Sequence, residues 1–185
     1  GGLAAAAYFW AGANLITPVA TVTPGDWGAL REAALTIKLA PAALALKRGQ
    51  EKELEIFLKP EELNHLLDQR VPEQFQRTRL ALATGDTATV ILFSRQLEPH
   101  RFINGEIRAD VTGSSGQFEV KVHRAKIGKK ELPHSVFYFM SRWIETTLET
   151  QVPFKEDRYK LTGFRRDGNI FKVTIRTRRP QSNSP

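Results

Sequence analysis

The sequence contains no cysteine, which excludes disulfide bonds, thiolate nucleophiles and thiolate metal ligands. It also contains no HExxH pair, no GxSxG nucleophile elbow and no glycine-rich phosphate or dinucleotide loop. Carboxylates cluster only as Glu61–Glu62, which a helix start explains, and Glu156–Asp157, which a loop explains. General acid–base catalysis needs two carboxylates in contrasting environments. We therefore expect a protein that is not an enzyme and uses no cofactor.

Histidines are few and scattered along the chain. His65, His100, His123 and His134 are not paired at the spacing of metal ligands. Isolated histidines of this kind are more often structural or solvated than metal-bound. The sequence therefore predicts no metal site.

A long hydrophobic run is also lacking. No residue from Leu3 to Ile16 is charged, but the run is shorter than the roughly 20 apolar residues that a membrane-spanning helix needs. Two interpretations stay open: the tail of a signal peptide or anchor helix, or a short alanine-rich helix packed on the domain. We divide the chain into an N-terminal apolar segment and linker (1–25), a single domain (26–180) and a tail (181–185).

Positive charge is what the sequence has in excess. The formal net charge is +7 and the isoelectric point is about 9.9, which favours nucleic acid, acidic lipid headgroups or acidic polysaccharide as partners. Composition does not choose among these partners, and a basic surface without any partner is an alternative. The chain has 185 residues, of which 41% are hydrophobic, so it can bury one core.

Alternating apolar residues predict strands through most of the chain. A strand followed by a helix that starts at Pro60 is predicted from two apolar stripes: Leu54, Ile56 and Leu58 on the strand, and Leu63, Leu66 and Leu67 on the helix. Further strands are expected over 78–84, 87–97, 101–111, 117–127 and 158–179. Tight turns are expected at Gly85–Asp86, Asn104–Gly105 and Asp167–Gly168.

Two stretches near the N-terminus are harder to assign. Asp26 is a candidate cap for a short helix that follows it. The alternation of Leu35, Ile37 and Leu39 then suggests a strand, whereas 42–46 fits either a strand or a helix.

The expected strands are joined by turns and not by helical crossovers. This predicts an α+β fold with an antiparallel sheet, and not a parallel α/β fold. We expect a curved antiparallel sheet of meandering strands, packed around a long C-terminal helix and accompanied by a shorter helix.

The segment 135–150 is dense in aromatic residues. Ser135 can cap a helix there, and one helical face is apolar: Val136, Phe139, Met140, Trp143, Ile144 and Leu148. One interpretation is that this face only closes the core. The other is that sheet and helix enclose an apolar groove for a ligand tail. The ligand-binding residues are in that case Phe137, Phe139, Met140, Trp143 and Ile144.

The last strand carries its basic residues on one side, opposite its apolar residues. Candidate anion-facing residues on it and its neighbours are Lys121, His123, Arg165, Arg166, Lys172, Arg176 and Arg178. The alternative is a solvated outer sheet face. Aromatic rings, which would stack on nucleic-acid bases, lie on the opposite side, so nucleic acid is disfavoured. Binding to an anionic membrane surface requires only the positive charge, without aromatic rings.

Three short segments occur in an order that resembles a known family: "LEIFLKPEELNHLLDQ", "LEPHRFINGEIRADV" and "AKIGKKELPHSVFYFMSRWI". They resemble the YpmS-like proteins, bacterial membrane-anchored extracytoplasmic proteins of unknown function. The similar region covers roughly Leu54 to Ile175, and it departs from the family pattern in hairpin spacing and in its basic C-terminal strand. The resemblance implies an N-terminal anchor, an exported globular domain and no established catalysis.

The expected function is therefore a non-catalytic exported or membrane-anchored domain, periplasmic or at the cell surface, that binds lipid or another apolar ligand. The alternative is a structural or interaction protein of the bacterial cell envelope that uses its basic sheet face on anionic lipid or polymer. A cytoplasmic nucleic-acid-binding protein is the third hypothesis. The sequence does not predict an oligomeric state.

Overall fold

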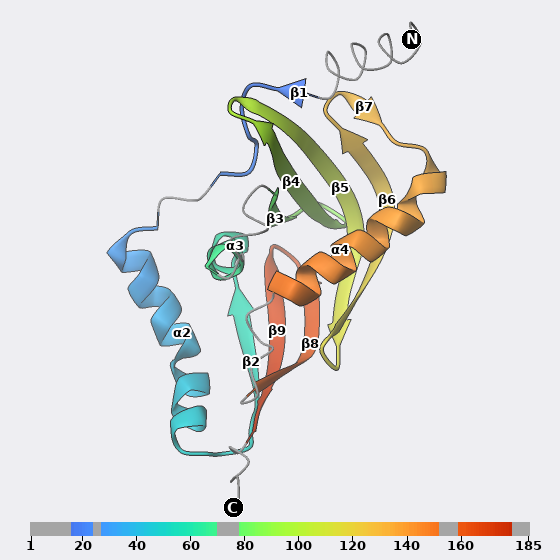
Figure 1. Cartoon of the computed structure of the whole chain (residues 1–185). Helices are drawn as coiled ribbons and strands as arrows, with labels where there is room; N and C mark the ends of the chain where they lie inside the picture. Colours follow the sequence, from blue (N-terminus) through green and yellow to red (C-terminus); the bar gives the residue numbers. More distant parts are fainter. Residues whose placement is uncertain (1–15, 24–26, 70–77, 152–158, 179–185) are drawn as a thin grey trace, which may run out of the picture.

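The computed structural model describes residues 16–23, 27–69, 78–151 and 159–178, in which three α-helices and nine strands occur (Figure 1). Their order is β1 (Ile16–Thr17), α2 (Ala29–Lys47), β2 (Glu53–Leu58), α3 (Pro60–Asp68), β3 (Thr78–Thr84), β4 (Thr89–Glu98), β5 (Arg101–Ser114), β6 (Gln117–Ile127), β7 (Lys130–Glu131), the 3₁₀ turn η2 (His134–Val136), α4 (Phe137–Gln151), β8 (Tyr159–Asp167) and β9 (Ile170–Thr177). The expected α+β fold, with an antiparallel sheet, a long helix near the C-terminus and a shorter helix, is confirmed.

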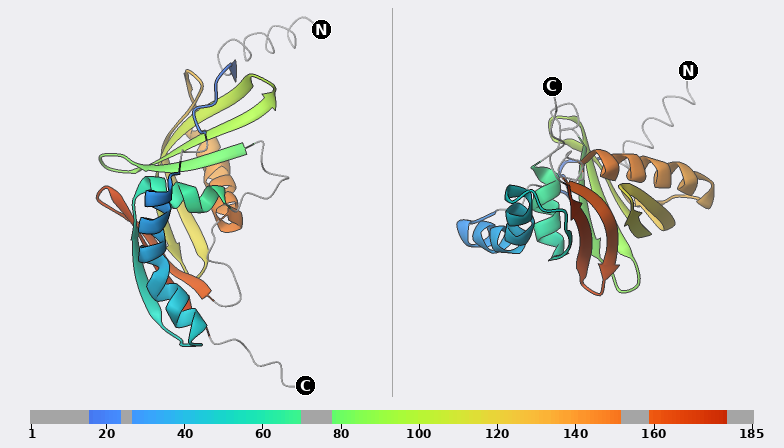
Figure 2. Two further views of the ribbon diagram at one scale, coloured as in Figure 1. Left: turned by 90° about the vertical axis from the view of Figure 1, so that its left-hand side faces the viewer. Right: turned by 90° about the horizontal axis from the view of Figure 1, so that it is seen from below.

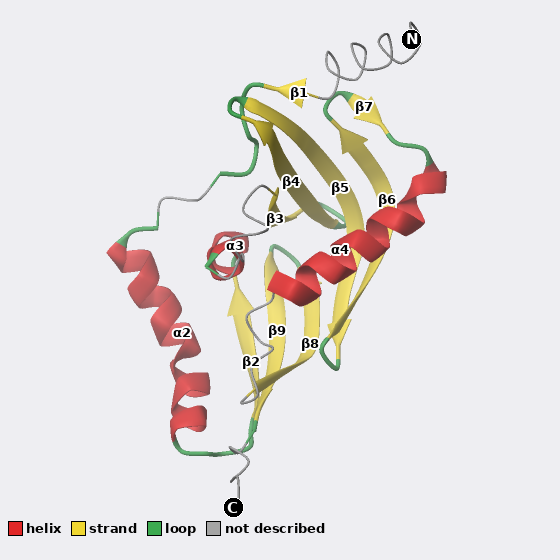
Figure 3. Cartoon of the chain, viewed as in Figure 1, coloured by secondary structure: helices red, strands yellow, loops and turns green. Residues whose placement is uncertain are grey.

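Strand β5 organises the sheet, whose order is β2-β9-β8-β5-β4-β3 (Figure 3). Residues 101–109 of β5 pair with β4, and residues 112–114 pair with β8 further along the same edge. The opposite edge pairs with β6 and, near its start, with β1. The sheet therefore splits at β5 into a β4–β3 arm and a β8–β9–β2 arm, and within the described residues the two arms do not pair at their ends.

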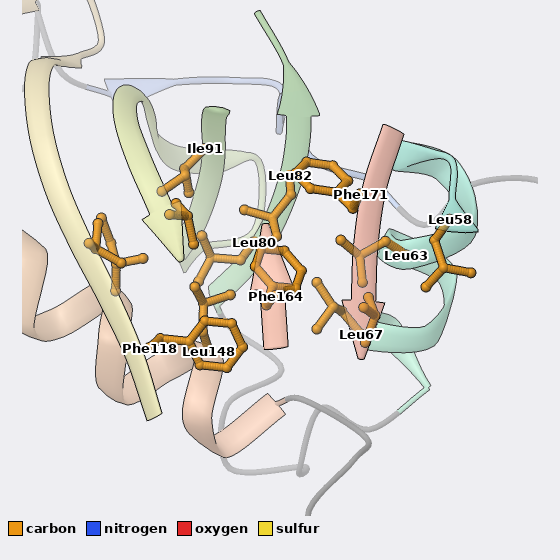
Figure 4. Packing of buried hydrophobic residues seen from close by; sticks show 14 of the residues in the cluster. Leu58, Leu63, Leu67, Leu80, Leu82, Ile91, Phe118, Leu148, Phe164 and Phe171 are labelled. Carbon is orange, nitrogen blue, oxygen red and sulfur yellow. The ribbon is translucent and has the colours of Figure 1, made fainter. Parts of the chain in front are cut away.

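The core lies on one side of this split sheet, which we call the inner face. Helices α2 and α3 lie beside β2 and β9, whereas α4 lies beside β6 (Figure 2). The buried cluster joins both arms to the helices; Figure 4 labels Leu58, Leu63, Leu67, Leu80, Leu82, Ile91, Phe118, Leu148, Phe164 and Phe171. The predicted leucine stripe of α3 and the predicted hairpins at Gly85–Asp86 and Asp167–Gly168 are confirmed.

Helix α2 is continuous from Ala29 to Lys47, so the strand suggested for its first half is wrong. Alanine-rich sequence favours a helix, and the residues that α2 buries are Leu35, Ala42 and Ala45 at helical spacing. Ile37, which the strand pattern placed beside Leu35, is instead 72% exposed. The helix begins after Gly28, and the proposed cap Asp26 lies outside the described residues.

An ion pair fastens α2 to α3. The Lys38 ammonium lies 2.6 and 2.7 Å from the two carboxylate oxygens of Glu62, which is buried. The same carboxylate accepts the backbone N–H of Lys59 at 2.8 Å and so caps the start of α3. The helix-start interpretation of Glu61–Glu62 is therefore confirmed for Glu62.

Asn104 and Gly105 lie inside β5, so the turn predicted at this pair is wrong. The chain turns instead at Pro99–His100, where His100 has a φ of 60°. Packing explains the glycine, because a Cβ at Gly105 would lie 2.1 Å from the ring of Phe93 on the paired strand.

The Asn104 side chain serves as an anchor for the N-terminal segment. Its Oδ1 accepts hydrogen bonds from the Ser94 hydroxyl at 2.6 Å and from the Thr21 backbone N–H at 3.1 Å. Its Nδ2 donates to the Val19 carbonyl at 2.8 Å, and Ser94 Oγ accepts the Val22 N–H at 2.9 Å. This network holds residues 17–22 against β4 and β5.

Helix α3 closes the free edge of β3 through one side chain. Asn64 Oδ1 accepts the Leu82 backbone N–H at 2.7 Å, and Asn64 Nδ2 donates to the Leu82 carbonyl at 2.9 Å. Leu82 is 1% exposed, so without Asn64 both of its backbone groups would be buried and unpaired. The amide thus replaces a neighbouring strand at this point of the edge.

We predict that Asn64→Ala lowers the free energy of unfolding by about 2–4 kcal/mol, because two buried backbone groups lose their partners. Asn64→Asp keeps the acceptor and loses the donor, so it should give an intermediate loss. Gln96→Ala, at an exposed position of β4, is the matched control. Urea unfolding measures all three, and an Asn64→Ala variant as stable as the control would contradict this role.

We predict that Gly105→Ala destabilises the fold by about 1–3 kcal/mol, because the added methyl group overpacks the site against Phe93. In a Phe93→Ala background the methyl group has room, so the same substitution should cost much less there. Thermal unfolding of the four proteins of this double-mutant cycle measures the coupling. Equal costs in both backgrounds would show that the Phe93 ring is not the reason for the glycine.

Candidate functional site

The inner side of α4 belongs to the core. Ile144 and Leu148 are fully buried, and two carboxylates of the same helix reach the free edge of β6. Glu145 Oε1 accepts the Val120 N–H at 3.0 Å, and Glu149 Oε1 accepts the Phe118 N–H at 3.4 Å. Helix α4 is thus fixed along β6 both by apolar packing and by side-chain hydrogen bonds to the strand backbone.

The outer side of α4 carries aromatic rings in solvent, contrary to the expected enclosed face. Phe139 is 71% exposed and Tyr138 69%, and their rings meet edge-on at 5.7 Å between centroids. Trp143 is 39% exposed, and its ring forms a T-shaped pair with that of Phe93, with 5.5 Å between centroids. The apolar face is wider than the strip of sheet that it covers, because α4 packs mainly along β6. We call Tyr138, Phe139 and Trp143 the aromatic ridge.

The predicted ligand-binding residues therefore divide into three groups. Ile144 is a core residue, Phe137 and Met140 are partly buried against the core, and Phe139 and Trp143 belong to the aromatic ridge. The expected cap at Ser135 is wrong, because Ser135 lies inside the 3₁₀ turn η2 and gives no capping hydrogen bond there.

Acidic neighbours compensate the predicted anion-facing surface. Lys172 lies 2.5 Å from Glu55, and Arg176 lies 2.9 Å from Glu53, because β9 pairs with β2. His123 lies 2.8 Å from Asp110 on the paired strand β5, and Lys121 stands opposite the same aspartate in the register. The sequence of β9 alone did not reveal that carboxylates on the neighbouring strands β2 and β5 neutralise these cations.

The three remaining predicted cations differ in their surroundings. Arg166 donates to the carbonyls of Gly85 and Gly168 at 2.9 and 3.1 Å, so its guanidinium stabilises two hairpin turns. Arg165 is exposed and stands opposite Lys172 in the register of β8 and β9, and Arg178 is exposed after β9 ends. A second like-charged pair, Lys160 opposite Arg176, lies on the same hairpin.

Histidines do not assemble a metal centre in the described ranges, where no group of histidine and carboxylate side chains could hold an ion. His100 lies in the β4–β5 turn, and His134 contacts the Phe137 ring at 4.7 Å between centroids. His65, by contrast, lies in a cleft.

This cleft, which we call the Trp27 cleft, opens between the start of α2, α3 and the free edge of β3. Its volume is about 420 Å³, within the range of small-molecule sites. Val22, Trp27 and Leu80 give it apolar walls. Glu61 and Asp68 bring carboxylates to its lining.

Trp27 is held by a chain of polar contacts. Its indole N–H donates to Glu32 Oε2 at 2.6 Å, and the same oxygen lies 3.0 Å from His65 Nε2. The rings of Trp27 and His65 stack with 4.0 Å between centroids and 10° between planes. Gln69 Nε2 lies 2.8 Å from His65 Nε2, so α2 and α3 together fix the wall of the cleft.

Asp68 has the one pKa that is clearly shifted in the described part of the chain. Burial removes water from the carboxylate and raises the pKa of Asp68 above its ordinary value of 3.8, while the charges of Arg79 and His65 partly oppose this. Among the described residues, the cation found beside Asp68 is Arg79, whose Nη1 lies 4.0 Å from the carboxylate, and the Asp68 side chain is 26% exposed. Asp68 is therefore a partly desolvated carboxylate, and the described residues compensate its charge only through the long contact with Arg79.

The sequence analysis missed the Trp27 cleft. The spacing of Glu61, His65 and Asp68 places three polar side chains on one side of a short helix. This was the local pattern that could have indicated a polar site there. Trp27 comes from a segment more than 30 residues earlier, and its approach depends on how α2 docks on α3. No local pattern encodes that docking.

Comparisons with known proteins do not assign a family: no family model matches the chain, and no match to a curated protein is found. In the parts of the chain that the structure describes, no helix has the length and apolar character needed to cross a membrane.

The raised pKa of Asp68 predicts a pH-dependent stability. Between the ordinary and the raised pKa the folded protein binds more protons than the unfolded chain, so this contribution to the free energy of unfolding falls as pH rises. It is complete below the ordinary pKa and is lost above the raised one. Asp68→Asn removes it, so the variant should gain stability relative to the parent on going from acidic to neutral pH.

Urea unfolding of the parent and Asp68→Asn across this pH range tests the prediction. Asp86→Asn, which removes an exposed carboxylate in the β3–β4 turn, controls for the change in net charge. A difference in the free energy of unfolding between the parent and Asp68→Asn that stays constant with pH would contradict the raised pKa of Asp68.

Proposed function

We propose that the protein is a non-catalytic binding domain that contacts lipid, or another apolar phase, through the aromatic ridge of α4. The observation that supports this is the double-sided helix: its inner side is buried in the core, while Tyr138, Phe139 and Trp143 face solvent. The proposal places the domain in the bacterial cell envelope, exported or membrane-anchored. That location is supported by the resemblance to the YpmS-like proteins alone.

Aromatic rings on a helix surface suit the boundary between water and hydrocarbon. Trp and Tyr combine an apolar ring with a polar group, which favours this boundary. Full burial of an exposed phenylalanine ring contributes roughly 1.5–3 kcal/mol. Arg142, between Phe139 and Trp143 in sequence, is exposed, and its guanidinium lies 2.9 Å from Glu145 Oε2. A long cationic side chain of this kind can remain among lipid headgroups while the rings are buried.

The threonines of α4 remove a desolvation cost from this contact. The hydroxyls of Thr146, Thr147 and Thr150 donate to carbonyls one turn earlier, at 2.7–2.9 Å. Because these hydroxyl hydrogens are already bonded within the helix, an apolar neighbour leaves no threonine donor unpaired. The C-terminal half of α4 is therefore less polar towards a partner than its composition indicates.

The basic sheet face supports the alternative, an envelope protein that binds anionic lipid or polymer. Two like-charged pairs stand opposite each other there, Arg165 with Lys172 and Lys160 with Arg176, and an anion would relieve their repulsion. Glu53 and Glu55 already compensate one member of each pair. The charges of the basic face are thus partly neutralised within the protein, whereas the rings of the aromatic ridge remain exposed to solvent. We therefore favour the ridge as the binding surface.

Flotation with lipid vesicles tests the proposal. The protein should bind phosphatidylcholine vesicles, and Phe139→Ala should weaken binding about tenfold, since a large part of one ring's burial free energy is lost. Phe57→Ala is the matched control, because Phe57 is an exposed aromatic residue on the opposite sheet face. Thermal unfolding should show that both variants are folded.

Lipid composition and salt separate the two surfaces. Binding through the ridge should persist without phosphatidylglycerol and at high salt, because it is apolar. Binding that requires phosphatidylglycerol, disappears with salt and is unaffected by Phe139→Ala would overturn the ridge and favour the basic face. Equal losses in Phe139→Ala and Phe57→Ala would also overturn it.

A further inference from the structure

The Trp27 cleft is a second place where the protein can hold a ligand, independent of the aromatic ridge. It lies on α2 and α3, whereas the ridge lies on α4 beside β6. Its lining combines apolar side chains with polar groups, most of which belong to α3, while Arg31 comes from α2. What the cleft can bind follows from which of those polar groups are already used.

Several polar groups at the cleft are engaged within the protein. The Asn64 amide is bound to the backbone of Leu82. His65 Nε2 contacts both Glu32 and Gln69, and Arg31 also has a partner. These groups therefore offer little to a ligand.

Two carboxylates of the cleft, Asp68 and Glu61, have spare capacity to accept hydrogen bonds. Within the described part of the chain Asp68 accepts no hydrogen bond, and the one cation paired with it there, Arg79, lies 4.0 Å away. Glu61 borders the same space and is exposed. Both are acceptors, so a complementary ligand must donate, and a positive charge would restore the stabilisation that Asp68 lost on leaving water.

We propose that the Trp27 cleft binds an organic cation, an ammonium or guanidinium group on an apolar body, with the body against Trp27, Val22 and Leu80 and the cation on Asp68. The cleft volume of about 420 Å³ suits a small molecule. The polar contacts of Trp27 and the hydrogen bond from the Val22 N–H to Ser94 fix two of these walls before binding. Pre-organised walls reduce the entropy lost on binding.

Phenethylamine and 3-phenylpropionate test the site, because they share an aromatic ring and differ in the sign of their charge. Proton–nitrogen correlation spectra of the full chain follow the Trp27 indole N–H, assigned by its loss in Trp27→Phe. Phenethylamine at millimolar concentration should shift this signal in a saturable way, and 3-phenylpropionate should not.

Two matched variants locate the cation. Asp68→Asn should weaken phenethylamine binding about tenfold or more, because a hydrogen bond to a charged group contributes that much. Asp110→Asn makes the same chemical change outside the cleft and should leave binding unchanged. Both variants should show cooperative thermal unfolding, so that a loss of binding is not a loss of fold.

Four results would overturn the proposal: no shift of the Trp27 signal by phenethylamine, equal binding of the acid and the amine, unchanged affinity in Asp68→Asn, or an equal loss in both variants. Vesicle binding through the aromatic ridge does not depend on any of these outcomes. Phe139→Ala should leave phenethylamine binding intact, which keeps the two proposals distinguishable.

Discussion

The unpaired edges of the split sheet are the constraint on which the rest of the structure depends. Because β4 and β8 follow one another along the same edge of β5, the sheet separates into two arms, one of which ends at β3. On the opposite edge of β5 the sheet ends at β6, so backbone groups of both β3 and β6 need partners. Asn64 of α3 supplies them on β3, and Glu145 and Glu149 of α4 supply them on β6. The positions of both helices, and with them the aromatic ridge and the Trp27 cleft, follow from this need.

The two candidate surfaces differ in how they arise from the helices. The ridge exists because α4 runs along one strand, so that its wide apolar face extends past the sheet and Phe139 is left in solvent. The cleft exists because α3 is short and contacts β3 through Asn64, while Trp27 closes the space on the other side by stacking on His65. A surface made by one helix and a cleft made by three elements are therefore suited to different partners, an extended apolar phase and a compact cation.

Local patterns in the sequence predict the strands and α3 well, because alternation and the Pro60 helix start are decided by nearest neighbours. They mislead where tertiary packing decides. Leu35, Ile37 and Leu39 alternate like a strand, yet lie in a helix, and Gly105 resembles a turn residue but makes room for Phe93. The helical spacing of apolar residues in 135–150 identified α4 as a candidate binding element. It did not predict which side of α4 faces solvent, because that depends on how the helix packs on the sheet. The cleft depends on Trp27 and Asp68 meeting across elements, which no periodicity reveals.

The sharing of β5 by both arms also has a consequence for the cooperativity of unfolding. Residues 105–109 of β5 pair with strands on both sides, and so do residues 112–114, where β8 takes the place of β4. Neither arm can separate from the other while this strand keeps its hydrogen bonds, so a local opening of one arm stops at β5. The backbone amides of β5 that are bonded to its neighbours should therefore exchange with solvent only when the whole domain opens, and they mark the last structure to be lost.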